Sequence, residues 1–162
     1  MKGEIVHKFL RQLLLIWLSV ACSPATAQVL PAVVTQDLPG MTLLGKGTMR
    51  FIGLKVYDVS LWTAMKSFSH QEPFALELIY NMNFKGSDIA ERSVKEMRGQ
   101  GYNDEAKRKR WGEDMAKIFP DIKPGERLVG VNVPGKEARF YTPERFIAAV
   151  PDPEFAKAFF DI

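Results

Sequence analysis

Apolar and polar residues alternate most regularly in the stretch 45–62, GKGTMRFIGLKVYDVSLW. From Arg50 to Ser60, every second residue falls on one face, which is apolar with a charge at each end. The opposite face is mostly apolar and carries Lys55 in its middle. This pattern is typical of a strand that is buried on both faces. We therefore expect strands over residues 41–47 and 49–62, bent or bulged around Gly45 and Gly47.

Four further segments have the patterning of strands. Residues 73–81 alternate between a face of large apolar side chains and a face that carries Glu77. Residues 126–133 and 137–141 flank a Pro-Gly-Lys turn and predict a hairpin. The β-branched residues of 29–35 predict a first or edge strand, because its proline cannot donate to a central ladder.

Helical spacing of apolar residues marks two segments in the middle of the chain. The first helix is expected over residues 86–98, with Asp88 and Glu91 as a capping pair. The second begins after Asn103 or Asp104 and ends at Phe119, before a proline. Because only a few residues join them, the two helices should pack on the sheet as a pair.

Two shorter helices are expected near the end of the chain. Thr142 is a suitable cap and Pro143 a suitable first residue for a helix that extends to Ala149. Residues 154–162 follow a Pro-Asp-Pro sequence and form the last expected helix. A strand-rich chain with helices added on one side indicates an α+β fold.

The N-terminal segment has the pattern of a secretory signal peptide. Three basic residues precede a run of nine apolar residues, 13–21, and Ala25-Thr26-Ala27 then gives a small-x-small cleavage pattern. The run is too short for a permanent membrane span. Cleavage after Ala27 would leave a single domain of residues 28–162 in the periplasm or outside the cell. Lipidation at Cys22 is the alternative, since Ser19-Val20-Ala21-Cys22 resembles a lipoprotein processing site.

Removal of residues 1–27 changes what the composition implies. The segment holds three basic residues and one acid, so the formal net charge falls from +3 to +1. No strong field then favours nucleic acid. The only cysteine is also lost, and His70 is the single histidine that remains. Disulfides, a cysteine nucleophile and common zinc sites are excluded, and we expect no metal and no cofactor.

The basic run 107–110, KRKR, lies on the second expected helix among acids. Pairs such as Glu105–Lys109 and Arg110–Asp114 are four residues apart and suit ion pairs along one helix. A solvated helix face explains the run better than a nucleic-acid site does.

Arg50 is the residue of most interest, and two interpretations are open. It is either a strand arginine that pairs with Asp58, Glu77 or solvent, or a fixed cation at the mouth of an apolar pocket. In the second case its guanidinium would bind a carboxylate, or stabilise a phenolate or enolate, through paired hydrogen bonds.

The chain resembles the exported bacterial branch of the chalcone isomerase-like proteins. The motifs that carry the resemblance are Gly45-x-Gly47-x-x-Arg50, GLKVYD at 53–58, LW at 61–62, PFALEL at 73–78, IAERSVKEM at 89–97 and FAKAFFDI at 155–162. They cover nearly all of the chain after residue 27. The resemblance implies an open-faced β-sandwich, in which a large antiparallel sheet carries helices on one face and a cleft lies between the layers.

Family members that close the flavanone ring use five polar groups, and Arg50 matches their arginine. The other four positions fall at Ile52 or a neighbour, near Ile89, near Glu96 and near Ile162. The departures favour the non-catalytic members, some of which bind fatty acids in the cleft.

The resemblance therefore implies an exported protein that binds a small apolar, fatty-acid-like acid, with Arg50 as anchor. Tyr57 is the nearest candidate for a second carboxylate contact, although strand alternation puts it on the face opposite Arg50. The alternative is an isomerase of the chalcone-flavanone type that depends on Arg50. A structural protein whose cleft is filled by side chains is a third possibility.

Overall fold

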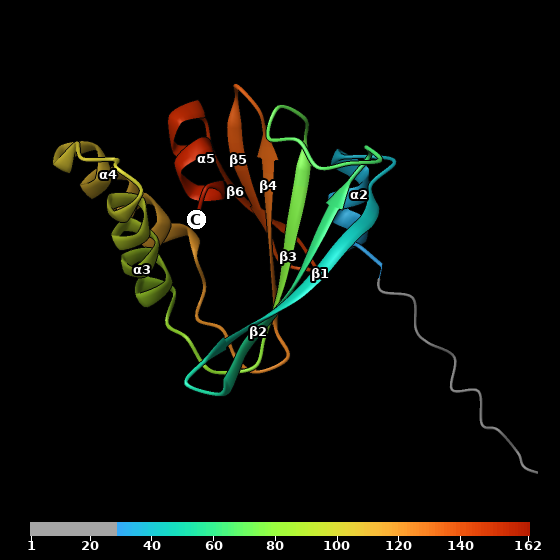
Figure 1. Cartoon of the computed structure of the whole chain (residues 1–162), viewed down its shortest axis with the longest axis horizontal. Helices are drawn as coiled ribbons and strands as arrows, with labels where there is room; N and C mark the ends of the chain where they lie inside the picture. Colours follow the sequence, from blue (N-terminus) through green and yellow to red (C-terminus); the bar gives the residue numbers. More distant parts are fainter. Residues whose placement is uncertain (1–28) are drawn as a thin grey trace, which may run out of the picture.

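The structure is a computed structural model and describes residues 29–162. A single antiparallel sheet runs through this part of the chain (Figure 1). The predicted signal peptide, 1–27, and Cys22 lie outside these residues. The six strands lie side by side in chain order: β1 (Thr42–Phe51), β2 (Leu54–Thr63), β3 (Phe74–Tyr80), β4 (Arg127–Val133), β5 (Glu137–Tyr141) and β6 (Phe146–Val150). The helices are α2 (Ala32–Asp37), α3 (Gly86–Gly99), α4 (Glu105–Ile118) and α5 (Pro153–Phe160).

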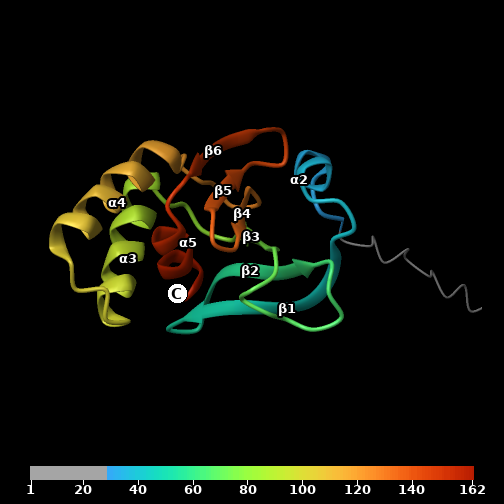
Figure 2. The ribbon, with the colours of Figure 1, turned by 90° about the horizontal axis from the view of Figure 1, so that it is seen from above.

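Helices cover both faces of the sheet. In Figure 1, α3, α4 and α5 lie on one side of the strands and α2 lies on the other, and Figure 2 shows the same arrangement from above. The larger core cluster joins α3, α4 and α5 to the sheet face that carries Phe74 and Phe140. The smaller cluster packs Leu30 and Val34 against the opposite face, around Trp62. These two faces are called the helix-layer face and the α2 face below.

The stretch 45–62 is a hairpin and not the expected long strand. β1 and β2 pair antiparallel, and the chain reverses at Ile52 and Gly53, which have φ angles of 47° and 78°. Positive φ at both central residues is the geometry of a type I′ turn, which usually selects Asn-Gly. Apolar alternation continues through the turn here, so no polar residue marked it in the sequence. The predicted bulge at Gly45 is confirmed by a register shift between Leu43 and Gly45.

Two other predicted elements are wrong. Residues 29–35 were expected to form a strand, but α2 begins after Pro31. Its Val34 is fully buried with Leu30, so packing on the sheet overrides the β propensity of this segment. The helix expected over 142–149 is instead a turn followed by β6, which pairs with β5. The free edge of β5 offers ladder hydrogen bonds that sequence patterning cannot show.

The remaining elements confirm the predictions, with corrections at their ends. β3, the β4–β5 hairpin, α3, α4 and α5 are present, and Asp104 caps α4 by accepting a hydrogen bond from the Lys107 N–H. The predicted capping pair of α3 is wrong, because Lys85 is its N-cap residue and the Gly86 N–H donates to Asp121. No helix among residues 29–162 is long and apolar enough to span a bilayer.

Candidate functional site

A row of aromatic rings lies at one end of the helix-layer face, where the sheet meets the start of α3. Tyr57 of β2 is half-buried and contacts Tyr80 of β3 edge to face, with ring centroids 5.9 Å apart. The Tyr80 ring in turn lies 5.5 Å from that of Phe84, in the loop that leads into α3. All three rings pack against the larger core cluster. The phenol of Tyr57 is therefore the polar group of an otherwise aromatic wall.

Arg92 of α3 is the cation that acts on Tyr57. Burial raises the pKa of the Tyr57 phenol, and the positive charge of Arg92 offsets part of this increase. Arg92 also forms an ion pair with Glu96 at 2.5 Å, and its side chain stays 67% exposed. At neutral pH, Tyr57 is thus a protonated hydrogen-bond donor in the field of a guanidinium that already binds Glu96. Such a pair can bind a carboxylate, whereas the phenol cannot serve as a general base.

Arg50 lies on the other face of the hairpin. Arg50 pairs with Lys55 beyond a register shift that follows the Met49–Tyr57 pair, and Lys55 binds Asp58, on the α2 face, at 2.6 Å. Thr48 is on that face too, because its hydroxyl donates to Asp58 at 2.7 Å. The geometry therefore does not bring Arg50 and Tyr57 together.

The Arg50 side chain is exposed and has no hydrogen-bond or ion-pair partner among residues 29–162. Both acids that the sequence suggested as partners bind other groups. Asp58 pairs with Lys55 at 2.6 Å, and the fully buried Glu77 pairs with Arg127 at 3.1 Å. Of the three partners that the sequence suggested for a strand arginine, Asp58, Glu77 and solvent, only solvent fits.

Four positions of this chain correspond to the remaining polar groups of catalytic family members, and the structure places them as follows. Ile52 lies at the tip of the hairpin, and Ile89 packs against the core. Glu96 is paired with Arg92, and Ile162 is exposed at the end of the chain. Ile52, Ile89 and Ile162 thus add no polar group to the wall around Tyr57, and the carboxylate of Glu96 is bound to Arg92.

Arg92 was missed by the sequence reasoning. It lies within the motif IAERSVKEM, but a charged residue on an amphipathic helix is most often solvated. Only the folded structure, in which Tyr57 and α3 border the same core cluster, shows that the charge of this arginine reaches Tyr57.

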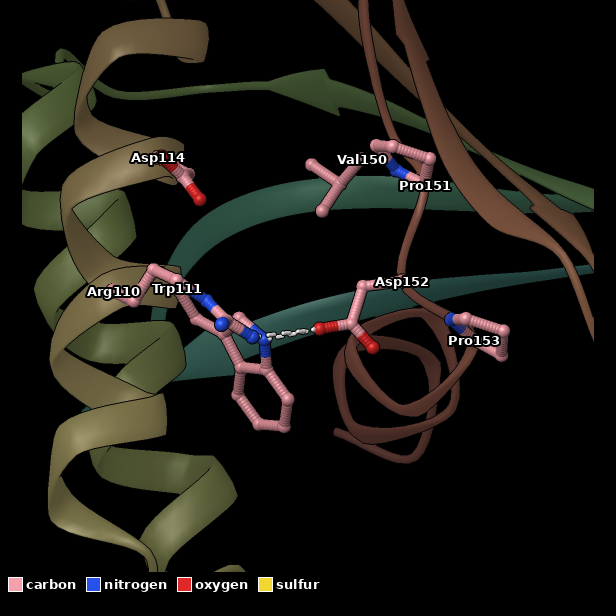
Figure 3. A pocket seen from close by; sticks show the side chains of 7 residues that line it. All are labelled: Arg110, Trp111, Asp114, Val150, Pro151, Asp152 and Pro153. Atoms are coloured by element: carbon pink, nitrogen blue, oxygen red, sulfur yellow. Dashed lines mark hydrogen bonds and ion pairs between the residues drawn. The ribbon is translucent and has the colours of Figure 1, made fainter.

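A cavity of about 360 Å³ lies at the opposite end of the helix layer, between α4 and the start of α5 (Figure 3). Asp152 is at its centre and accepts hydrogen bonds from the Trp111 indole N–H at 3.0 Å and from Arg110 at 3.1 Å. Its second oxygen accepts from the N–H groups of Glu154 and Phe155 and so caps α5. Asp152 thus joins α4 to α5 and caps α5, which is a structural role.

A second cavity of about 200 Å³ adjoins the first and is lined by Tyr102, Lys107 and Glu154, among others. Lys107 binds Glu154 at 2.6 Å, so the basic run 107–110 contacts α5 as well as solvent. The pairs expected along α4 are wrong in detail: Arg110 binds Asp152, and Asp114 binds Lys117. Neither cavity is lined by Arg50 or Tyr57.

His70 and the acids form no metal site in the described part of the chain, where no cluster of three or more possible protein ligands occurs. The His70 side chain is 58% exposed, its ring contacts Phe68 and Phe74, and its Nδ1 lies 3.9 Å from Asp161.

Comparison with known proteins supports the fold and the family. No curated protein sequence matches the chain. Among solved structures, a fatty-acid binding protein of Arabidopsis thaliana is similar, with a TM-score of 0.57 and 10% sequence identity over 76% of this chain and 79% of that chain. At this identity the likeness shows the fold alone, and it confirms the expected α+β architecture of an open antiparallel sheet with helices. A family model described as chalcone isomerase-like matches residues 21–162, and the chain therefore belongs to the chalcone isomerase-like family.

Proposed function

We propose that this protein binds a small apolar acid, fatty-acid-like in chemistry, between the β1–β2 hairpin and α3, and that it does not catalyse a reaction. Membership of the family and the fold shared with a fatty-acid binding protein support this proposal. The observation that carries it is the protonated, half-buried phenol of Tyr57 in an aromatic wall, within the field of the Arg92 charge. A carboxylate there would gain two charge-assisted contacts, and its chain would pack on apolar side chains.

The identity of the cationic anchor is part of the proposal. Arg50 is the anchor that the family resemblance implies, and it is a free, exposed guanidinium near the hairpin end. Arg92 is a second candidate because it acts on the same face as Tyr57. The two arginines lie on different elements and can be replaced separately.

Ligand-dependent thermal stabilisation tests the proposal. Saturated fatty acids of increasing length are added to the native protein and to Arg50→Ala, Arg92→Ala and Tyr57→Phe, with the exposed Lys95→Ala on α3 as matched control. A ligand at about a hundred times its Kd should stabilise the native protein by roughly 2.7 kcal/mol. Loss of the anchor should weaken binding by about 10- to 100-fold, because a hydrogen bond to a charged group contributes about 1.5–3 kcal/mol.

The results separate the anchors. If Arg92→Ala and Tyr57→Phe lose the response and Arg50→Ala keeps it, the site lies on the helix-layer face. If only Arg50→Ala loses it, the site includes the α2 face of the hairpin. If no fatty acid raises the melting temperature of the native protein, the proposal fails.

A second candidate function is chalcone-type isomerisation, which family membership alone favours. Ring closure requires that the substrate phenolate be held and the developing enolate be stabilised. The raised pKa of Tyr57 and the apolar residues at Ile52 and Ile89 argue against it. An absorbance assay with chalcones should show no turnover, and turnover that disappears in Arg50→Ala would support the isomerase instead.

We also propose that the protein belongs to the exported branch of the family and is cleaved after Ala27. The charged start, the apolar run 13–21 and the Ala-Thr-Ala sequence support export. Intact mass measurement of protein recovered from cell fractions should give a chain that begins at Gln28. A lipid-modified chain that begins at Cys22 would contradict this cleavage site.

A further inference from the structure

The end of the β1–β2 hairpin is apolar and open to solvent. Phe51, Ile52 and Leu54 are 61%, 86% and 60% exposed, and with Gly53 they make up what is called the apolar tip below. Figure 1 shows this hairpin end extending past the start of α3, at the end of the molecule away from α2. A cluster of large apolar side chains on a projecting turn is a mark of an interaction surface.

Ile52 is also strained. Its φ of 47° is in the left-handed region, where a β-branched side chain crowds the backbone. Asn at this turn position would relieve the strain and would be well solvated. Ile52 is therefore unfavourable in the isolated molecule both for its backbone strain and for its exposed apolar side chain. Contact of its side chain with an apolar phase would offset both costs.

Positive charge surrounds the apolar tip. Residues 45–58 contain Lys46, Arg50 and Lys55 against one acid, Asp58, which already binds Lys55 at 2.6 Å. Lys46 and Arg50 have no ion-pair partner in the part of the chain that the structure describes. Long cationic side chains beside a projecting apolar turn suit anionic headgroups, because they can reach the lipid phosphates while apolar groups enter the layer below.

We propose that the apolar tip inserts into the interface of an anionic phospholipid bilayer, with Lys46 and Arg50 at the headgroups. A bilayer fits better than a protein partner, because the surface is a convex turn with cations beside it. This proposal does not depend on the fatty-acid site, since it concerns residues of the turn itself.

Vesicle binding of the full chain tests the proposal. Binding to phosphatidylglycerol-containing vesicles and to phosphatidylcholine vesicles is compared for the native protein, Ile52→Asn and Met65→Ser, at low and high salt. Met65 is a matched control, because it is 46% exposed in the loop that follows β2, at the opposite end of that strand from the apolar tip. Since each variant carries the same N-terminal segment, a difference between them reports on the substituted side chain.

We expect the native protein to prefer anionic vesicles and to lose this preference at high salt. Ile52→Asn should weaken binding by about tenfold or more, the effect of withdrawing one large aliphatic side chain from an apolar phase. It should not lower the melting temperature, because asparagine suits the turn. Met65→Ser should bind like the native protein.

A tryptophan placed in the apolar tip locates the contact. In Phe51→Trp, the added emission should shift to the blue and be quenched by brominated lipid. Unchanged vesicle binding in Ile52→Asn, or an unshifted Phe51→Trp spectrum on bound vesicles, would overturn the proposal. So would a dimer in sedimentation velocity that Ile52→Asn dissolves, because the apolar tip would then be an interface between two copies of the chain.

Discussion

The side chain of Asp152 connects two helices. It precedes α5, caps that helix through one oxygen, and accepts from Arg110 and from the buried Trp111 indole through the other. Burial by itself would raise the pKa of this carboxyl, but the hydrogen bonds from Trp111 and from the N–H groups of Phe155 and Glu154, with the charge of Arg110, hold the pKa below its usual range. Asp152 is therefore ionised at neutral pH and joins α4 to α5.

Replacement of Asp152 should be costly. Asp152→Ala removes a helix cap, which contributes about 1 kcal/mol, and leaves the buried Trp111 N–H unsatisfied, which costs about 1–3 kcal/mol. We expect the free energy of unfolding in urea to fall by about 2–4 kcal/mol. Asp152→Asn keeps one acceptor oxygen, so it can retain either the cap of α5 or the hydrogen bond from Trp111 and should lose less. Equal losses in the two variants would mean that charge, and not hydrogen bonding, dominates at this residue.

Tyr141 makes stability depend on pH in the alkaline range. Burial raises its pKa to about 12, with a further increase from its hydrogen bond to Asp37, against an ordinary value of 10.0. Below pH 10 both the folded and the unfolded states keep the phenol proton, and the stabilisation is complete. Between pH 10 and 12 the unfolded state loses the proton first, so stability falls as pH rises.

The comparison with Tyr141→Phe isolates this effect. The native protein should lose up to about 2 kcal/mol more than the variant between pH 10 and 12, measured by urea unfolding at each pH. At neutral pH the variant should be less stable by about 1 kcal/mol, because the hydrogen bond that ties β5 to α2 is gone. Parallel pH curves for the two proteins would show that Tyr141 titrates normally.

The sequence alone identified only some of the residues of the candidate site. Arg50 and Tyr57 were chosen from a motif. They lie on the two strands of a hairpin, so alternation along the single strand that the sequence predicted could not decide their faces. Arg92 could not be found in this way, because its effect on Tyr57 depends on how α3 and the sheet meet around the larger core cluster. Whether Arg50 or Arg92 holds a ligand stays a prediction.

Local sequence signals predicted helices and strands correctly where tertiary packing favoured the same structure. Asp104 and the proline after Phe119 marked the ends of α4, and the Pro-Gly-Lys turn marked the β4–β5 hairpin. The predictions for α2 and β6 were wrong because tertiary contacts, burial of Val34 and pairing with β5, decided those segments. The turn at Ile52 gave no polar signal at all.

The start of α3 depends on a glycine. A Cβ added to Gly86 would lie 1.9 Å from the backbone oxygen of Phe119, and backbone cannot move aside as a side chain can. Gly86→Ala should therefore destabilise the protein by about 3 kcal/mol or more, measured as the free energy of unfolding. Gly99→Ala, at the end of the same helix and in open space, should be neutral or slightly stabilising. Similar values for the two variants would contradict the close contact between α3 and the end of α4.

At the scale of the molecule, the sheet separates two environments. Its α2 face holds Arg50 and the smaller core cluster, while its helix-layer face holds Tyr57, the aromatic wall and the larger cluster. The overall architecture could be predicted, because strand and helix signals and the family resemblance agreed over most of the chain. The ligand could not, because a binding site depends on side-chain geometry between layers and not on the order of elements.

We propose that a small apolar acid occupies the space beside Tyr57, and native mass spectrometry of the purified protein can detect it there. We expect a species heavier than the protein by one fatty acid, either as purified or after addition of a fatty acid, and a smaller fraction of this species in Tyr57→Phe. A spectrum that shows only the mass of the protein alone, with and without added fatty acids of several lengths, would contradict fatty-acid binding.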